Sequence, residues 1–151
     1  MILPSKAVYQ ETWKDVFQAN LSALFQIALL LTADSHEAEV NLATVIRKLD
    51  FSKEIDEDAL AVIHAALARK IIGGGGITSL SGAAEARSML QPGLLPVLQL
   101  ERLPRVCFVL RMLVGFDTST CARMLGIDEG GVKVSLRVAV LQLHQCTKKT
   151  S

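Results

Sequence analysis

Residues 103–143 constrain the fold more than any other stretch, because two glycine-containing breaks interrupt a run of apolar residues at helical spacing there. The segment from Arg105 to Val114 carries apolar residues at positions 106, 109, 110 and 113, which lie on one face of a helix. Gly115 follows directly, where a helix end favours a residue that can adopt positive φ. This stretch therefore predicts a helix that ends at residue 114.

Two further helices are expected after this break. The first is short, from about Ser119 to Leu125, with Asp117 or Thr118 as its N-cap and Gly126 at its end. Asp128 is a suitable N-cap for the second, longer helix. A short helix, a turn containing glycine and a longer helix form the helix-turn-helix pattern, in which the second helix enters the major groove of DNA.

This part of the chain resembles the C-terminal promoter-recognition domain of bacterial RNA polymerase sigma factors of the extracytoplasmic-function (ECF) group. The matching residues are Leu103, Pro104, Phe108, Val109, Leu110, Gly115, Phe116, Ala122, Leu125, Gly126, Ile127, Gly130, Val132, Lys133, Leu136, Ala139 and Leu143. Response regulators of the LuxR type have a similar helix-turn-helix, but the Leu-Pro opening and the Gly-Ile turn fit the sigma pattern better.

The resemblance implies that the first turns of the third helix contact promoter DNA. The candidate DNA-binding residues are Glu129, Gly130, Gly131, Lys133, Ser135 and Arg137. Lys133 and Arg137 would contact phosphates or bases, and the backbone amides of residues 129–131 would face a phosphate at the helix N-terminus.

The sequence departs from the sigma pattern at several positions of this motif. The family usually has Glu where this chain has Thr120, and Thr where it has Gly131. Basic residues of the family are replaced by Ser135, Val138 and Val140. Phosphate contacts supply much of the affinity for DNA, so this helix is expected to bind DNA with few basic side chains.

The third helix is apolar on two faces when its residues are placed at 100° intervals. The face expected in the core gathers Val132, Leu136, Ala139, Val140 and Leu143. Val134, Val138 and Leu141 gather on the opposite face, and a helix that is apolar on two sides is usually buried on two sides. The N-terminal part of the chain, a second copy in a homodimer, or another protein such as an anti-sigma-like partner could cover this second face. All three would compete with DNA.

The N-terminal part is also expected to be helical. A helix from Leu21 to Thr32 is apolar nearly all round and should be the central buried element, with Trp13 as an anchor in the segment before it. The next residues, Leu31-Thr32-Ala33-Asp34 and Glu37-Ala38-Glu39, again resemble the sigma family, where they form a turn and a helix that docks on core RNA polymerase. Asp34 or Ser35 would cap that helix.

The helix after this turn has apolar residues where the sigma family has acidic and amide residues. Val40, Ala43 and Thr44 occupy those positions, and together with Leu42 and Ile46 they are expected to pack against neighbouring helices.

Residues 58–72 predict an amphipathic helix that packs through Leu60, Ile63, Leu67 and Ile71. Sigma factors carry aromatic and basic residues in the corresponding region and use them to open promoter DNA. Residues 59–68 contain no aromatic side chain on which an unpaired base could stack. This helix is therefore not expected to melt DNA.

Four consecutive glycines at residues 73–76 mark the clearest break in the chain. They lack the Gly-Lys-Ser/Thr ending of a phosphate-binding loop and indicate a linker. We therefore expect an N-terminal helical domain over residues 1–72, a linker with a short helix over residues 73–91, and a helix-turn-helix domain over residues 92–151. Leu94 to Leu103 should form the first helix of that last domain, with Pro96 in its first turn.

Composition supports an all-α fold, because half of the residues are hydrophobic but only 5% are aromatic, which favours aliphatic helix packing. The net charge of +1 is unevenly distributed. Residues 1–100 contain 8 basic and 11 acidic residues, and residues 101–151 contain 8 basic and 4 acidic residues. The basic C-terminal third favours DNA as its ligand, and it also favours contact with the acidic N-terminal part.

No enzymatic or cofactor site is expected. Cys107, Cys121 and Cys146 follow no secretory signal and are interpreted as reduced thiols of a cytoplasmic protein, the first two as small core residues. His144 next to Cys146 lacks further ligands at a spacing that would bind a metal. No apolar run is long enough to span a bilayer, and no nucleophile or paired carboxylate suggests catalysis.

These observations predict an all-α, sigma-factor-like transcription regulator. It would bind DNA through its C-terminal helices and dock on core RNA polymerase through its N-terminal helices. The alternative is a diverged sigma-like protein-interaction module that binds a partner or dimerises without binding DNA.

Overall fold

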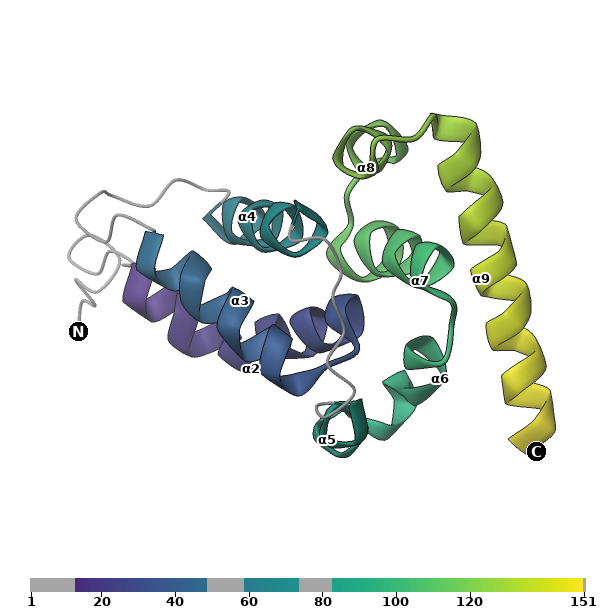
Figure 1. Ribbon diagram of the computed structural model, residues 1–151, viewed down its shortest axis with the longest axis horizontal. Helices are drawn as coiled ribbons and strands as arrows, with labels where there is room; N and C mark the ends of the chain where they lie inside the picture. Colours follow the sequence, from purple (N-terminus) through teal and green to yellow (C-terminus); the bar gives the residue numbers. More distant parts are fainter. Residues whose placement is uncertain (1–12, 49–58, 74–82, 151) are drawn as a thin grey trace, which may run out of the picture.

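The computed structural model describes residues 13–48, 59–73 and 83–150, and these residues form helices and short connections without strands (Figure 1). The all-α class predicted from composition is therefore confirmed. Trp13 opens the first described helix, but its side chain lies outside the described part of the chain, as do all residues of the predicted linker from 74 to 82.

Three helices form the N-terminal half: α2 (Trp13–Thr32), α3 (Ser35–Lys48) and α4 (Ala59–Gly73). Helix α2 packs against both of the others and contributes the fully buried Leu24, Leu29 and Leu30. Ile63 and Leu67 of α4 are also fully buried. The central position expected for residues 21–32 and the packing face expected for residues 58–72 are confirmed.

The outer side of α3 differs from its prediction. Leu42 is buried and Ile46 is partly buried, as expected, but Val40 and Ala43 are exposed. The prediction that these two residues pack against neighbouring helices is wrong, because α2 and α4 cover only one side of α3.

The turn between α2 and α3 is held by side-chain hydrogen bonds. The Thr32 hydroxyl donates to the carbonyl of Ala28 at 2.7 Å, and Asp34 Oδ1 accepts from the amide of Glu37 at 3.0 Å. Asp34 is therefore the N-cap of α3, one of the two candidates named from the sequence. Between them Ala33 has a φ of 57°, in the left-handed region that glycine adopts more readily than alanine.

Residues 92–108 form a broken helical path where the sequence predicted one helix over residues 94–103. A 3-10 turn η2 (Pro92–Leu94) leads into a short α6 (Leu95–Leu98), and α7 (Arg102–Phe108) begins only after a break at residues 99–101. Pro104 explains the break, because it has no amide hydrogen to pair with the carbonyl of Leu100. That carbonyl accepts a hydrogen bond from Nη1 of the buried Arg105 at 3.1 Å instead.

Helix α7 continues as a π-helix, η3 (Val109–Val114), so the predicted helix does end at residue 114. The amides of Gly115 and Phe116 both donate to the carbonyl of Leu110, at 3.0 and 2.9 Å, which widens the last turn. Gly115 has a φ of 96°, as its predicted role at a helix end requires. Arg111 Nη1 closes the turn by donating to the carbonyl of Phe116 at 2.9 Å.

The two halves of the chain are packed against each other. Helix α2 contacts α7 and η3, and α4 contacts α8 (Thr118–Leu125). The short α5 (Ala83–Met89) lies within the helix expected in the linker. Gln26 of α2 joins this region to the N-terminal half, because it donates to the carbonyl of Met89 at 2.8 Å and accepts from the amide of Gln91 at 3.0 Å.

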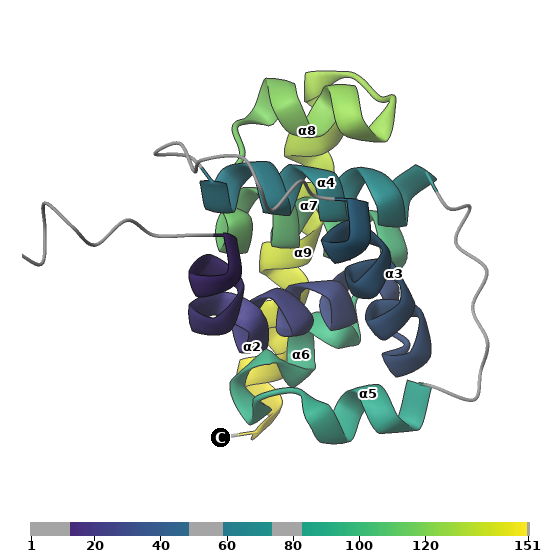
Figure 2. The ribbon, with the colours of Figure 1, turned by 90° about the vertical axis from the view of Figure 1, so that its left-hand side faces the viewer.

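Helix α9 (Glu129–Thr150) lies along the side of the molecule away from α2 and α3, and both ribbon views show it beyond α7 (Figures 1 and 2). It packs on α6, α7 and α8. Its opposite side is therefore turned away from the N-terminal half.

Substitution of Ala33 by glycine should stabilise the protein. Alanine in the left-handed region carries a steric cost that glycine avoids, so Ala33→Gly is expected to raise the free energy of unfolding by about 1 kcal/mol. The matched control Ala43→Gly lies within α3 and should lower it by a similar amount. Urea denaturation followed by circular dichroism measures both, and destabilisation by Ala33→Gly would contradict the strain argument.

Substitution of Arg105 by alanine should destabilise the protein by about 2 kcal/mol or more, because the carbonyl of Leu100 loses its buried donor and a cavity remains. The neighbouring Arg102 is exposed, and Arg102→Ala should change the free energy of unfolding by less than about 0.5 kcal/mol. Equal effects of the two variants would show that the bond to Leu100 does not hold the break.

Candidate nucleic-acid interface

The first helix of the predicted DNA-binding motif is capped by Asp117. Its Oδ1 accepts from the amide of Thr120 at 2.8 Å and from the hydroxyl of Ser119 at 3.0 Å. Asp117, rather than Thr118, is therefore the N-cap of α8. The pKa of the Asp117 carboxyl is lowered by these hydrogen bonds, first by those from the side chain and the amide of Thr120 and then by the one from the Ser119 hydroxyl.

The predicted turn connects α8 to α9. Gly126 ends α8 with a φ of 70°, and Ile127 is partly buried against the core. Asp128 Oδ1 accepts from the amide of Gly131 at 2.6 Å, which makes Asp128 the N-cap of α9. The predicted succession of a short helix, a glycine turn and a long helix is present, with both caps at the expected residues.

The inner face of α9 contains one residue that was expected to bind DNA. Val132 and Ala139 are fully buried, and Ser135 between them is only 8% exposed. The Ser135 side chain is hydrogen-bonded to Cys107 of α7, whose thiol pKa is raised by burial and partly lowered by this bond. The prediction that Ser135 contacts DNA is wrong. Ser135 comes three residues after Val132 and four before Ala139, so it lies on the same packed face of the helix.

The outer face of α9 presents the other DNA-binding candidates. Glu129, Gly130, Lys133 and Arg137 are exposed, and Gly131 is half-buried. Lys133 and Arg137 are four residues apart and therefore lie one turn apart on the same side of the helix. They can reach two neighbouring phosphates of a DNA backbone.

The N-terminus of α9 is a poorer anion site than the sequence suggested. The amide of Gly131 is already paired with the Asp128 carboxylate. The exposed carboxylate of Glu129 lies in the same turn and would repel a phosphate. Among the described side chains of this helix, Lys133 and Arg137 are therefore the principal groups that could bind DNA.

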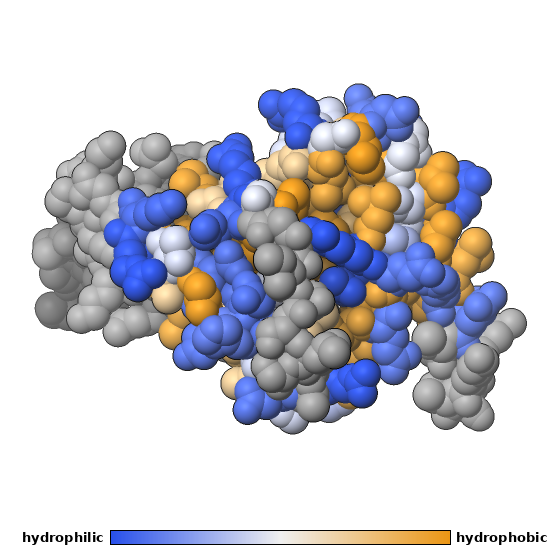
Figure 3. Space-filling model, viewed as in Figure 1, coloured by the Kyte–Doolittle hydropathy of each residue, from blue (hydrophilic) through white to orange (hydrophobic). Residues whose placement is uncertain are grey.

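The second apolar face of α9 is exposed. Val134 is 62% exposed, Leu141 57% and Val138 37%. The interpretation in which the N-terminal part of the chain covers these residues is therefore wrong for the part of the chain that the structure describes. Figure 3 shows apolar side chains at the surface along the edge formed by α9.

Val140 also departs from its prediction, since it was placed on the core face and is 48% exposed. Val140 lies on the flank of α9 between the core face and the outer face. This flank is left open by the helices on which α9 packs, which are α6, α7 and α8. Sequence spacing gave the right face for Val132 and Ala139 but could not show where the packed face ends.

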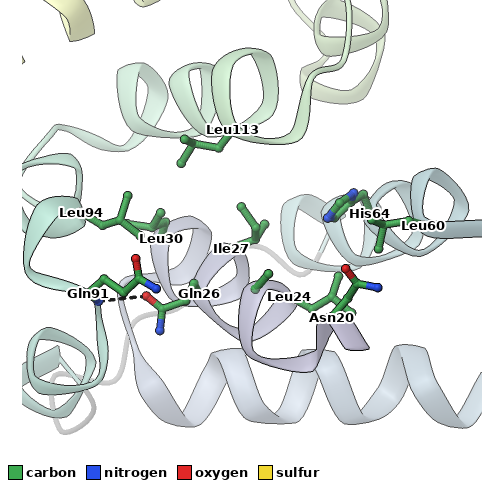
Figure 4. A pocket seen from close by; sticks show the side chains of 11 residues that line it. Asn20, Leu24, Gln26, Ile27, Leu30, Leu60, His64, Gln91, Leu94 and Leu113 are labelled. Atoms are coloured by element: carbon green, nitrogen blue, oxygen red, sulfur yellow. Dashed lines mark hydrogen bonds between the residues drawn. The ribbon is translucent and has the colours of Figure 1, made fainter. Parts of the chain in front are cut away.

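A groove of about 280 Å³ lies between the two halves, and sequence reasoning missed it (Figure 4). Leu24, Ile27 and Leu30 of α2 line it, with His64 of α4 at one end and Leu113 of η3 facing them. Burial lowers the pKa of His64 from its ordinary value, which favours the neutral imidazole. No sequence signal marks this groove, because its residues come together only when the halves pack.

The remaining predictions about chemistry concern cysteines, metals and membranes. Cys107 and Cys121 are free and fully buried, so their prediction as small core residues is confirmed. Burial raises the pKa of the Cys121 thiol to about 11. The described residues include no group of three or more His, Cys, Asp or Glu side chains that could hold a metal ion. Among the described helices, none has the length and hydropathy to cross a bilayer.

Comparison of the chain with family models, with curated proteins and with solved structures gives no match.

The cap of α8 should make stability depend on pH. Because the folded pKa of Asp117 lies below its ordinary value of 3.8, its ionised form stabilises the fold in full above that value. This contribution is lost as the pH falls through the lower, folded pKa. Asp117→Asn keeps a capping oxygen but no charge, so its melting temperature should be below that of the wild type at pH 7 and should approach it below pH about 3. A difference that is constant over this range would contradict the assignment.

Proposed function

We propose that this chain is a sigma-factor-like transcription regulator without enzymatic activity that binds promoter DNA through a helix-turn-helix formed by α8 and α9. One observation carries the proposal: Lys133 and Arg137 lie one turn apart on the exposed face of α9, directly after a capped glycine turn. In a helix-turn-helix this is the face that enters the major groove, while the first helix crosses the DNA backbone.

The charge distribution supports this choice of ligand. The basic excess of the chain lies in residues 101–151, which include α8 and α9. Arg123 of α8 is exposed and its Nη2 donates to the hydroxyl of Thr120 at 3.3 Å, which holds a third basic group in the last turn of α8. A surface with these groups attracts the phosphate backbone irrespective of base sequence.

Docking on core RNA polymerase through the α2–α3 region is the second part of the proposal. It is supported by the resemblance of residues 31–39 to the sigma pattern and by the exposed side of α3, where Glu39, Val40 and Ala43 are accessible to a partner. An exposed apolar residue beside a carboxylate suits a protein surface better than a nucleic acid.

A protein-interaction module is the second candidate function. The specific observation in its favour is the exposure of Val134, Val138 and Leu141, which occupy the outer face of the helix that would enter DNA. An apolar patch of this kind on a surface helix is typical of an interaction site.

Binding of DNA can be tested with the full chain by fluorescence anisotropy of a labelled duplex over a series of salt concentrations. The wild type should bind with an affinity that falls steeply with salt. The double variant Lys133→Ala/Arg137→Ala should bind more weakly, and the slope of log K against log salt should become shallower by about 2, one unit for each lost phosphate contact. Arg47→Ala, which removes an exposed basic residue of α3, is the matched control and should bind like the wild type.

Two outcomes would overturn the DNA proposal. The first is an absence of binding by the wild type even at low salt. The second is binding that the double variant leaves unchanged. Either result would favour the protein-interaction module.

A further inference from the structure

The groove between the two halves of the chain has walls from both of them. Aliphatic side chains of α2 form one wall, and Leu113 of η3 faces them across the groove (Figure 4). Leu94 of η2 lies at one end and His64 of α4 at the other. A molecule bound in the groove would therefore touch the N-terminal and the C-terminal half at once.

The size of the groove fits one small molecule. A cavity of about 150 Å³ with apolar walls can hold benzene, and this groove has a volume of about 280 Å³. It has room for an alkyl chain of about eight carbons that carries one small polar group. It is too small for a helix of a partner protein, whose diameter with side chains is about 10 Å.

The lining of the groove favours a neutral ligand. The described residues that line it include no Asp, Glu, Lys or Arg side chain. The amide of Gln26 is already engaged, because it donates to the carbonyl of Met89 at 2.8 Å and accepts from the amide of Gln91 at 3.0 Å. A charged ligand would lose its hydration in this groove without gaining an ion partner.

His64 is the polar group that could orient such a ligand. A neutral imidazole has one hydrogen-bond donor and one acceptor, and burial favours this neutral form by lowering the pKa of His64. Within the described part of the chain, no residue is hydrogen-bonded to the imidazole. A hydroxyl group can both donate and accept, so it can pair with either tautomer of His64.

The π-helical turn η3 keeps the two walls apart. The amide of Gly115 donates to the carbonyl of Leu110, which is the wide hydrogen-bond pattern of a π-helix, and such turns are rare and frequently occur at functional sites. Leu113 belongs to this turn and is 39% exposed although it faces the apolar side chains of α2. Protein cores are otherwise closely packed, so the space beside Leu113 is suited to an apolar guest.

We propose that the groove binds a neutral amphiphilic small molecule, whose aliphatic body of about eight carbons lies between Ile27 and Leu113 and whose hydroxyl pairs with the imidazole of His64. This site requires neither DNA nor polymerase binding and is independent of the proposed function. Because the bound molecule contacts both halves of the folded chain, it should raise the melting temperature.

Titration of the full chain with 1-octanol at about pH 8, followed by the methyl signals in proton-carbon NMR spectra, tests the site. The methyl groups of Leu24, Ile27 and Leu113 should shift with a common dissociation constant on the order of 0.1 mM. Val62 of α4 is exposed and does not line the groove, so its methyl signals should not move. Octanoate, which is charged at this pH, should bind at least about tenfold more weakly.

Two variants separate the apolar walls from the polar end. Leu113→Trp fills the groove and should weaken the binding of 1-octanol about tenfold or more. The matched control Met112→Trp adds the same side chain at a neighbouring position that is 55% exposed and does not line the groove, so it should bind like the wild type.

His64→Leu keeps an apolar wall but removes the hydrogen bond, so 1-octanol should bind about three- to tenfold more weakly. Toluene has no hydrogen-bonding group and should bind this variant at least as tightly as the wild type. Unchanged melting temperatures without ligand would show that the variants fold.

The proposal is overturned if saturating 1-octanol leaves the groove methyl signals in place, if octanoate binds as tightly, or if the two tryptophan variants bind alike. Spectra of the protein without ligand reveal other occupants. Nuclear Overhauser contacts from the methyl groups of Ile27 to residues 1–12 would show that the chain itself fills the groove. Groove signals that shift with protein concentration would show that a second copy does. Either result would also overturn the small-molecule site.

Discussion

The burial of α2 is the constraint on which the rest of the structure depends. Residues 24–31 of this helix are buried or partly buried at every position, and α3 and α4 can cover only part of them. Its remaining apolar surface packs against α7 and η3, which belong to the other half of the chain. Because burial of this apolar surface is favourable, the contacts of α2 with α7 and η3 hold the two halves of the chain together. The contacts that cover α2 also fix the direction in which α9 points.

The parts of the fold that the sequence predicted are those with a local physical cause. Gly115 and Gly126 adopt the positive φ that their positions at helix ends require, and Asp117 and Asp128 cap the helices that follow them. Each of these features depends on residues within one turn of each other. The break before α7 was missed although Pro104 is equally local, because the bond from the buried Arg105 to the carbonyl of Leu100 depends on a side-chain position that sequence spacing does not give.

In the candidate site, too, the sequence predicted the features that depend on spacing within one helix. Spacing at 100° per residue placed Val134, Val138 and Leu141 on the outer face, and it placed Val132 and Ala139 in the core. Spacing could not show whether residues at the edge of the packed face are buried, because the width of that face depends on which neighbouring helices cover each flank of α9. Ser135 falls under α7, whereas Val140 is left in solvent. The groove at His64 could not be foreseen at all, since residues of α2, α4 and η3 line it jointly.

The outer face of α9 combines two kinds of side chain whose interactions respond differently to the solution. Contacts of Lys133 and Arg137 with phosphates weaken as salt rises, because binding releases counterions from the DNA. Contacts between apolar residues such as Val134 and Leu141 are not screened, and salts that are excluded from protein surfaces strengthen them. The ligands of the two candidate functions, duplex DNA and a protein partner, are thus weighted in opposite directions by ionic strength. Rising salt therefore favours the protein-interaction function over DNA binding, with no change in the fold that α2 holds together.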